Sequence, residues 1–105
     1  MVARFDMTIA EFQNIIRQTY HDRDAGRGMP RTFMWLVEEV GELARALQQG
    51  EREALAQEFA DVLAWLTTLA SITGIDLEEA AEKRYGSGCP KCLRIPCQCA
   101  RGALV

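Results

Sequence analysis

The sequence has little that would predict β-structure, a membrane span or secretion. Strand-like alternation is nearly absent, and no apolar run approaches the roughly 20 residues that cross a bilayer. The opening residues MVARFDMTIAEF lack the apolar stretch of a signal peptide, so we expect a cytoplasmic protein. The 105 residues suit one domain of the usual roughly 100–200 residues. A composition of 49% apolar and 26% charged residues is typical of a globular chain and excludes a disordered or fibrous one.

Acidic residues are missing from one end of the chain, and cysteines are missing from the rest. Residues 1–85 hold nine Lys and Arg against 15 Asp and Glu, a charge of −6, whereas residues 86–105 hold three bases and no acid. All four cysteines lie in the last 17 residues. The acidic body argues against nonspecific nucleic-acid binding as the main role but leaves room for a cation. We therefore divide the chain into a body, residues 1–86, and a cysteine-rich tail, residues 87–105.

Helix-starting and helix-ending signals divide the body into four segments. Predicted helices cover about residues 8–22, 32–49, 51–73 and 77–85. Thr8 with Glu11, and Asp76 with Glu79, have the spacing of capping boxes, which mark the starts of the first and last helices. Residues 22–31 are rich in Gly and charge and contain a Pro, so they are predicted to form a loop.

The connection between the second and third predicted helices is very short, and Gly50 there is suited to end a helix. Two helices joined in this way form an antiparallel hairpin. The predicted fold class is therefore an all-α antiparallel bundle of about four helices. One protomer is too thin to bury both faces of the hairpin, so we expect a homodimer or tetramer to complete it, with the active site near the interface.

Each hairpin helix carries a pair of acidic residues at i and i+3. Glu39 and Glu42, preceded by Glu38, lie on one helix, and Glu58 and Asp61 lie on the other. Each pair shares one helix face beside the apolar stripe, so an antiparallel hairpin would bring four carboxylates together at the edge of the core. Like charges at short range raise one another's pKa, and a divalent cation reverses their repulsion. The pattern therefore predicts a Mg²⁺ site for a phosphorylated substrate.

Two other interpretations of these acids are available. Solvated acids on a helix surface are the ordinary case for any single Glu, although two spaced pairs beside two apolar stripes favour a site. A dinuclear iron bundle is a second kind of metal site, but it uses Glu-x-x-His pairs. The one histidine, His21, lies far from either pair along the chain.

The acidic pattern resembles the signature of a known enzyme family. Glu38-Glu39-x-x-Glu42, followed after fifteen residues by Glu58-x-x-Asp61, is similar to the motif of the MazG-like all-α nucleoside triphosphate pyrophosphohydrolases. The segments WLVEEVGELARAL and EFADVLAWL resemble the two metal-binding helices of that family at nearly every position. The resemblance extends over about residues 8–85. It implies hydrolysis of a nucleoside triphosphate between the α and β phosphates, which releases the monophosphate and pyrophosphate.

The resemblance also implies roles for the acidic residues. Those that would bind Mg²⁺, or Mn²⁺ in its place, are Glu39, Glu42, Glu58 and Asp61. Glu38 would lie beside the metal ions and either contact a further ion or orient the attacking water. The body contains no evident Ser, Cys or His nucleophile, so direct attack by a metal-activated water is the simplest route.

Other side chains are candidates for substrate binding. By resemblance, Lys83 and Tyr85 at the end of the last helix would reach the phosphates, although a base at a helix end is also favoured by the helix dipole. Trp35 lies one turn before Glu39 on the same face and is placed to stack on a base; Trp65 stands in the same relation to Asp61. Core packing is the alternative for both tryptophans. Phe12 and His21 are weaker candidates.

The tail has the cysteine spacing C-x2-C-x4-C-x-C, formed by Cys89, Cys92, Cys97 and Cys99. Four thiolates on a Gly- and Pro-containing segment suit tetrahedral Zn²⁺, which would fold a segment that has no core of its own. A closed set of four thiolates predicts a structural zinc rather than a catalytic one. Free or redox-active thiols and disulfides are the alternatives, and disulfides are rare in the cytosol.

The most direct interpretation is a Mg²⁺-dependent hydrolase of (deoxy)nucleoside triphosphates that serves nucleotide-pool housecleaning. A second class of function is a noncatalytic helical dimerisation module whose zinc tail binds a protein or nucleic-acid partner. Phosphoribosyl-ATP pyrophosphatase, from the same superfamily, is a second enzymatic alternative. No sequence feature distinguishes one nucleoside triphosphate from another.

Overall fold

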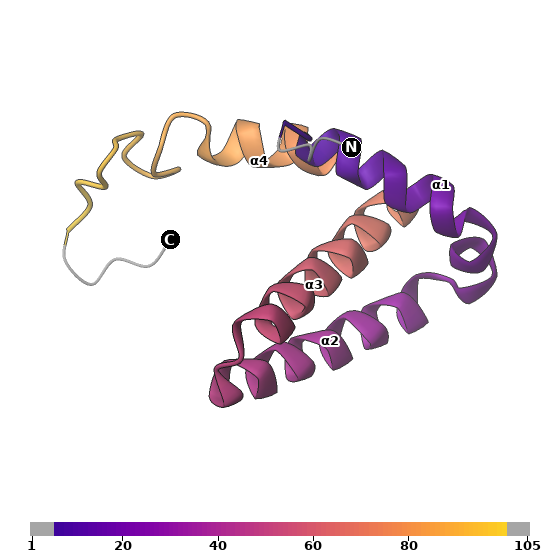
Figure 1. The fold of residues 1–105 in the computed structure, drawn as a ribbon. Helices are drawn as coiled ribbons and strands as arrows, with labels where there is room; N and C mark the ends of the chain where they lie inside the picture. Colours follow the sequence, from indigo (N-terminus) through magenta and orange to yellow (C-terminus); the bar gives the residue numbers. More distant parts are fainter. Residues whose placement is uncertain (1–5, 101–105) are drawn as a thin grey trace.

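The computed structural model describes residues 6–100, which form four helices and no strand. The helices are α1 (Ile9–Arg27), α2 (Met29–Gln49), α3 (Arg52–Ile72) and α4 (Leu77–Tyr85). This confirms the predicted all-α fold class. Figure 1 shows α2 and α3 side by side as a hairpin, with α1 lying across the end of that hairpin at which α3 finishes.

The α2–α3 hairpin makes the most extensive contacts in the molecule. Its turn is short because Gly50 takes the left-handed conformation, with φ of 74°, and ends α2. The next residue caps α3, since the Glu51 carboxylate accepts hydrogen bonds from the backbone N–H groups of Glu53 and Ala54. The two acidic pairs therefore lie on adjacent antiparallel helices, as the sequence predicts.

The prediction of a loop over residues 22–31 is wrong. Helix α1 continues to Arg27, and only Gly28, with φ of 81°, separates it from α2. Pro30 lies in the first turn of α2, where a missing backbone N–H costs no hydrogen bond. The charged residues before Gly28 support the helix, because Asp24 pairs with Arg27 one turn later.

Helix α1 bends at Tyr20, whose φ of −119° and ψ of 16° are not helical. Beyond the bend, Arg27 contacts Thr32 of α2 and Trp65 of α3. Gln13, in the straight part, is buried and joins α1 to the connection between α3 and α4. Its side-chain amide donates to Ser71 Oγ and to the backbone oxygen of Ile75, and its Oε1 accepts from the N–H of Leu77.

The helix starts follow the predicted capping residues. The Thr8–Glu11 capping box forms with both of its reciprocal hydrogen bonds. At α4 the Asp76 side chain accepts from the N–H of Glu79. Helix α4 then leaves α3 at an angle of 99°. Among the described residues no single helix has the length and hydropathy of a membrane span, and only the bent pair of α3 and α4, taken together, meets those two criteria.

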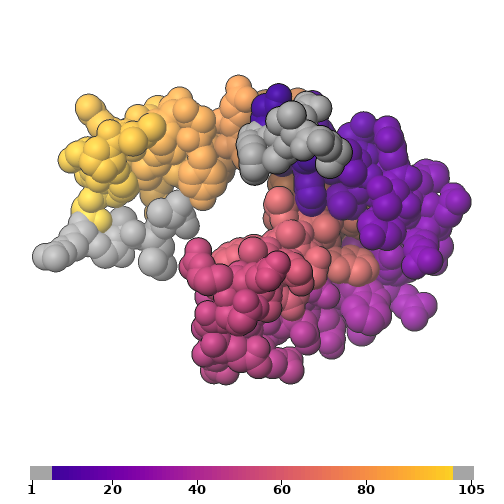
Figure 2. Space-filling view, in the orientation of Figure 1, coloured from indigo at the N-terminus to yellow at the C-terminus, as the bar shows by residue number. Residues whose placement is uncertain are grey.

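One chain has very little apolar core. Ala46 is the one buried apolar residue of the described part, and the other buried residues there are polar, namely Gln13, Thr32, Thr67 and Thr68. The chain exposes 8334 Å², whereas a compact monomer of 11.8 kDa exposes about 5900 Å². Figure 2 shows part of the cause: α4 and the following residues up to 100 project as an arm, with open space between the arm and the hairpin.

Candidate functional site

Three of the predicted metal ligands meet at the middle of the α2–α3 hairpin. Glu39 comes from α2, and Glu58 and Asp61 come from successive turns of α3. Each offers a carboxylate oxygen, and these oxygens lie within 4.8 Å of one another. We call these three residues the acidic cluster. It forms because the i, i+3 pair on α3 presents both side chains to the facing turn of α2.

The acidic cluster is electrostatically unfavourable without a cation. Oε2 of Glu39 is buried and has no hydrogen-bond partner. Desolvation, followed by the charges of Glu58 and Asp61, raises the pKa of Glu39. Desolvation and the charge of Asp61 likewise raise the pKa of Glu58. Hard divalent cations bind carboxylate oxygens, so the orphaned oxygen and the mutual repulsion both fit a bound Mg²⁺ or similar ion.

The other two predicted acids lie outside the acidic cluster. Glu42 is exposed, and its carboxylate accepts from Arg45 at 3.3 Å. It shares a shallow depression with Glu58, and its charge contributes to the raised pKa values of Glu39 and Glu58. Glu38 is also exposed and borders a different depression, beside Arg31 and Trp35.

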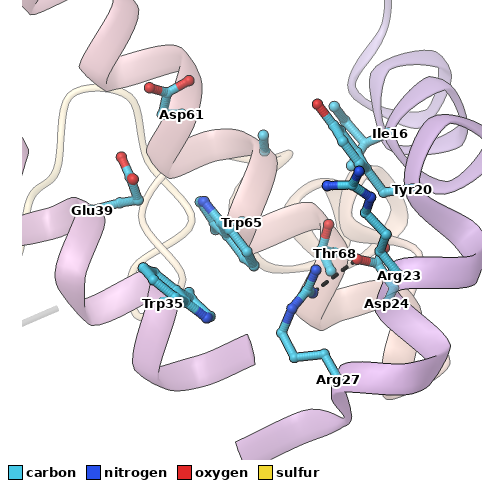
Figure 3. Close-up of a pocket in the computed structure, with 11 residues that line it drawn as sticks. Ile16, Tyr20, Arg23, Asp24, Arg27, Trp35, Glu39, Asp61, Trp65 and Thr68 are labelled. Atoms are coloured by element: carbon cyan, nitrogen blue, oxygen red, sulfur yellow. Dashed lines mark hydrogen bonds and ion pairs between the residues drawn. The ribbon is translucent and has the colours of Figure 1, made fainter. Parts of the chain in front are cut away.

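A cavity of about 440 Å³ opens beside the acidic cluster. Its size is in the range of small-molecule sites. Glu39 and Asp61 line one part of it, and helices α1, α2 and α3 all contribute to its walls. Figure 3 shows the labelled lining residues, which are Ile16, Tyr20, Arg23, Asp24, Arg27, Trp35, Glu39, Asp61, Trp65 and Thr68.

Both tryptophans of the protein line this cavity. Their rings stack with centroids 6.1 Å apart and an angle of 20° between the ring planes. The guanidinium of Arg27 lies over the Trp65 ring, 4.7 Å from its centroid. Trp35 is 50% exposed and Trp65 is half-buried. The pair is therefore a wall of the cavity and not a buried core contact.

Arg27 is fixed by two further partners. Its Nη1 donates to Asp24 Oδ1 at 2.9 Å and to Thr32 Oγ1 at 3.4 Å. The side chains of Arg27 and Asp24 are only 16% and 13% exposed. The hydrogen bond to Thr32 therefore connects the bent end of α1 to α2, and the ion pair with Asp24 fixes the cation that lies over Trp65.

Sequence reasoning missed the contribution of α1 to the cavity, because the segment was predicted to be a loop. A signal was present: Tyr20, Arg23, Asp24 and Arg27 have the spacing i, i+3, i+4 and i+7, which places them on one helix face. All four line the cavity.

Several predicted substrate-binding residues lie elsewhere in the chain. Lys83 is 79% exposed and pairs with Glu79 at 3.4 Å, and Tyr85 is also exposed. Both belong to the projecting α4, and neither lines the cavity. Phe12 and His21 do not line it either.

The four cysteines of the tail come together as the sequence predicts. Their sulfur atoms lie within 4.8 Å of one another. Cys89 Sγ lies 3.6 Å from Cys99 Sγ, and Cys92 Sγ lies 4.0 Å from Cys97 Sγ, so all four are free thiols. We call these four residues the cysteine cluster. It could hold one metal ion.

A tight turn sets the cysteine cluster. The N–H of Leu93 donates to the Cys89 oxygen at 2.7 Å, and the N–H of Cys89 donates to the Arg94 oxygen at 3.1 Å. Leu93 takes a left-handed φ of 61°, and Gly88 takes a φ of 100°. A Cβ on Gly88 would lie 2.6 Å from the Arg94 oxygen, so this close approach requires glycine.

Backbone N–H groups point at the sulfur atoms. The N–H of Gln98 donates to Cys92 Sγ at 3.3 Å, and the N–H of Cys99 donates to Cys97 Sγ at 3.3 Å. Backbone hydrogen bonds lower the pKa of Cys89 to about 6 and also lower that of Cys92. Hydrogen bonds with Cys97 and Cys89 raise the pKa of Cys99 to about 12. The backbone thus stabilises the thiolates of Cys89 and Cys92, and a cation is required for Cys99 to be a thiolate beside them.

The family can now be assigned. The sequence model of the MazG nucleotide pyrophosphohydrolase domain matches residues 28–86. The match covers more than half of the chain, so the chain belongs to this family. It includes α2, α3 and α4, and therefore the acidic cluster and both tryptophans, and it leaves out α1 and the cysteine cluster. No curated protein is similar enough to the chain to count as a relative.

Proposed function

We propose that this protein hydrolyses a (deoxy)nucleoside triphosphate to the monophosphate and pyrophosphate, with Mg²⁺ or Mn²⁺ as cofactor. The observation that carries the proposal is the acidic cluster, in which Oε2 of Glu39 is buried without a hydrogen-bond partner. The cluster borders a cavity lined by both tryptophans, in a chain of the MazG family. Removal of noncanonical or surplus nucleotides is the role that fits such an activity, and we place it in the cytoplasm.

The acidic cluster would hold the divalent ion. Glu39, Glu58 and Asp61 supply oxygens that already converge, and we assign Glu42 as a further ligand because its charge acts on both Glu39 and Glu58. A bound divalent ion supplies charge neutralisation at the phosphates and activation of water. We assign Glu38, next to Glu39 on the solvent side of α2, to the orientation of the attacking water.

The tryptophan pair would bind the nucleobase. Trp35 is the half-exposed member, and its ring lies in the cavity wall on the same helix face as Glu39. A nucleobase stacked on the Trp35 ring is stabilised by aromatic contact alone, with no hydrogen bond needed. Stacking also keeps the phosphates near the acidic cluster, since the same cavity includes Glu39 and Asp61.

Lys83 and Tyr85 require a second copy of the chain to act on the substrate. Both are exposed on the projecting α4 and lie outside the cavity of their own chain. We propose a homodimer or tetramer in which α4 of one copy approaches the site of another. The chain exposes 8334 Å², an excess of about 2400 Å² over a compact monomer. Burying such an excess is enough for a stable interface.

The test of the proposed function is product identification with a panel of nucleotides. Purified protein with Mg²⁺ is incubated with each ribo- and deoxyribonucleoside triphosphate and with phosphoribosyl-ATP, and products are separated by ion-exchange chromatography. The proposal predicts monophosphate and pyrophosphate in equal amounts. Release of inorganic phosphate and a diphosphate, or of no product from any triphosphate, would contradict it.

We also propose that the cysteine cluster binds one structural Zn²⁺ and that residues 87–105, of which the structure describes 87–100, form a separate zinc knuckle. The converging sulfur atoms and the N–H donors aimed at Cys92 and Cys97 support this assignment. Four protein thiolates complete a tetrahedral site and leave no open position for catalysis. Metal analysis of the purified protein should give one zinc per chain, and Cys92→Ser should remove it. Disulfides in the protein purified under reducing conditions would overturn the assignment.

A further inference from the structure

The bent end of α1 supplies the cavity with two arginines that differ in their partners. Arg27 is part-buried and bonded to Asp24 and Thr32, and it lies over Trp65. Arg23, also in the cavity wall, is exposed and makes no hydrogen bond or ion pair with any described residue. Its guanidinium extends from α1 into the cavity (Figure 3). Arg27 therefore has a structural role, and the donors of Arg23 are free to bind a ligand.

The cavity has two chemically different ends. Figure 3 shows the tryptophan pair between the carboxylates of Glu39 and Asp61 and the arginines of α1. Under the proposed function, on which this inference rests, a nucleotide lies with its phosphates toward the acidic cluster and its base on the tryptophans. The edge of the base that lies farthest from the phosphates then faces the bent end of α1, where Arg23 lines the cavity.

Arginine is a donor without acceptor capacity, and its fork matches two adjacent acceptors. Guanine presents such a pair, O6 and N7, whereas adenine presents a donor, N6, beside N7. The one carboxylate on this part of the wall, Asp24, is already bonded to Arg27, so it offers little to the adenine donor. The donors of Arg23 therefore complement a purine that presents two adjacent acceptors, as guanine does, and they do not complement adenine.

We propose that Arg23 is a specificity-determining residue that selects guanine over adenine at the nucleotide site. The donors of Arg23 hydrogen-bond to O6 and N7 of the base stacked on the tryptophans. A bidentate contact of this kind discriminates between bases by about 5- to 150-fold, which is the expected preference for dGMP over dAMP.

Tryptophan fluorescence tests this proposal without any turnover. The protein has two tryptophans and both line the cavity, so quenching reports on ligands bound there. Titrations use dGMP and dAMP, which are not hydrolysed, with the full-length protein and its Arg23→Met variant. Arg17→Met is the matched control, because Arg17 lies on the same helix, outside this cavity, and bonds to Asn14.

The wild type and Arg17→Met should bind dGMP about 5- to 150-fold more tightly than dAMP. Arg23→Met should bind the two nucleotides equally, with the same affinity for dAMP as the wild type. Equal binding of the two by the wild type, or an equal loss for both in Arg23→Met, overturns the proposal. The second result would make Arg23 a general attractor of phosphate. A selective, Arg23-dependent dGMP signal with no cleavage of any triphosphate in the panel would leave this inference standing and refute the proposed function. Cleavage of triphosphates together with equal binding of dGMP and dAMP would do the reverse.

Discussion

At the scale of single residues, Glu39 is the most informative side chain. Its Oε2 is buried without a partner, and its pKa is raised by desolvation and by two neighbouring carboxylates. A residue placed in this way lowers the stability of the metal-free fold. Such a cost is typical of a site that is completed by its ligand.

The first prediction follows from that cost. Glu39→Gln should raise the melting temperature of the metal-free protein by a few degrees, because it removes one of three converging charges while keeping the side-chain volume. Mg²⁺ should raise the melting temperature of the wild type and have little effect on the variant, since only the wild type keeps the full ligand set. Calorimetry with EDTA and with Mg²⁺ measures both. A metal-free variant less stable than the wild type would show that Glu39 is a structural residue.

The second prediction concerns Gly88. A methyl group there would collide with the Arg94 oxygen and with Ile95, and the φ of 100° already disfavours any side chain. Gly88→Ala should therefore weaken metal binding by the cysteine cluster by about 10- to 100-fold, as other disturbances of a ligand-supporting shell do. Competition with a chromogenic zinc chelator measures the affinity.

Gly41→Ala is the control for this substitution, because Gly41 lies within α2 and has open space around it. It should leave zinc affinity unchanged. Equal zinc affinities for Gly88→Ala and the wild type would mean that the turn does not organise the sulfur atoms.

At the scale of elements, the bend in α1 decides the shape of the site. The last turns of α1 reach the hairpin only because the helix departs from regularity at Tyr20. The ion pair of Asp24 and Arg27, with its contacts to Thr32 and Trp65, then holds this end in place.

The third prediction tests the role of that ion pair. Asp24→Ala should destabilise the protein by about 1–3 kcal/mol, because it leaves a part-buried guanidinium without its charged partner. The double variant Asp24→Ala/Arg27→Met should recover part of the loss, since it removes the unpaired charge as well. Urea unfolding of the wild type, the two single variants and the double variant gives the coupling. Additive effects would indicate that the ion pair does not fasten α1.

Comparison of the elements shows how far sequence reasoning reached. Helix α4 was predicted with its observed bounds, because Asp76 caps it and Gly86 follows it. The hairpin was predicted from its short connection and Gly50. The end of α1 was missed because glycine and proline near residues 26–30 suggest a loop, whereas here Pro30 is accommodated in the first turn of a helix. Local composition does not separate these two uses of proline.

In the candidate site, too, some features could be predicted from the sequence and others could not. The acidic cluster followed from i, i+3 spacing on two helices known to be adjacent, and the cysteine cluster followed from spacing alone. Glu42 and Glu38 share the motif but point outside the cluster, since side-chain direction within a turn depends on neighbours such as Arg45. The arginines of α1 depend on a bend that no local pattern specified.

At the scale of the whole molecule, the exposed apolar surface is the dominant feature. Helix α2 carries an outward row of half-exposed apolar side chains, namely Phe33, Val37, Val40 and Leu47. This side of α2 is thus left uncovered within one chain. This surface, with the open space beside the arm, is why we propose that the functional unit contains more than one chain.

The fourth prediction is therefore an oligomer in solution. Light scattering after size exclusion should give a dimer or tetramer at micromolar concentration, and Val37→Asp should shift it toward the monomer by placing a charge in the apolar row. Arg52→Asp, a charge change at an exposed position at the start of α3, is the control and should leave the mass unchanged. A wild type that remains monomeric would contradict the proposed assembly.

If the acidic cluster is the hydrolytic centre, as we propose, the removal of one of its carboxylates must abolish hydrolysis, whereas the same change elsewhere on α3 must not. Pyrophosphate release is measured for the wild type, for Glu58→Gln and for Glu53→Gln, which makes the same change at an exposed position of the same helix. We expect Glu53→Gln to retain full activity and Glu58→Gln to lose at least about 100-fold, the scale on which removal of one electrostatic group from an active site acts. Equal activity of the two variants would contradict this proposal.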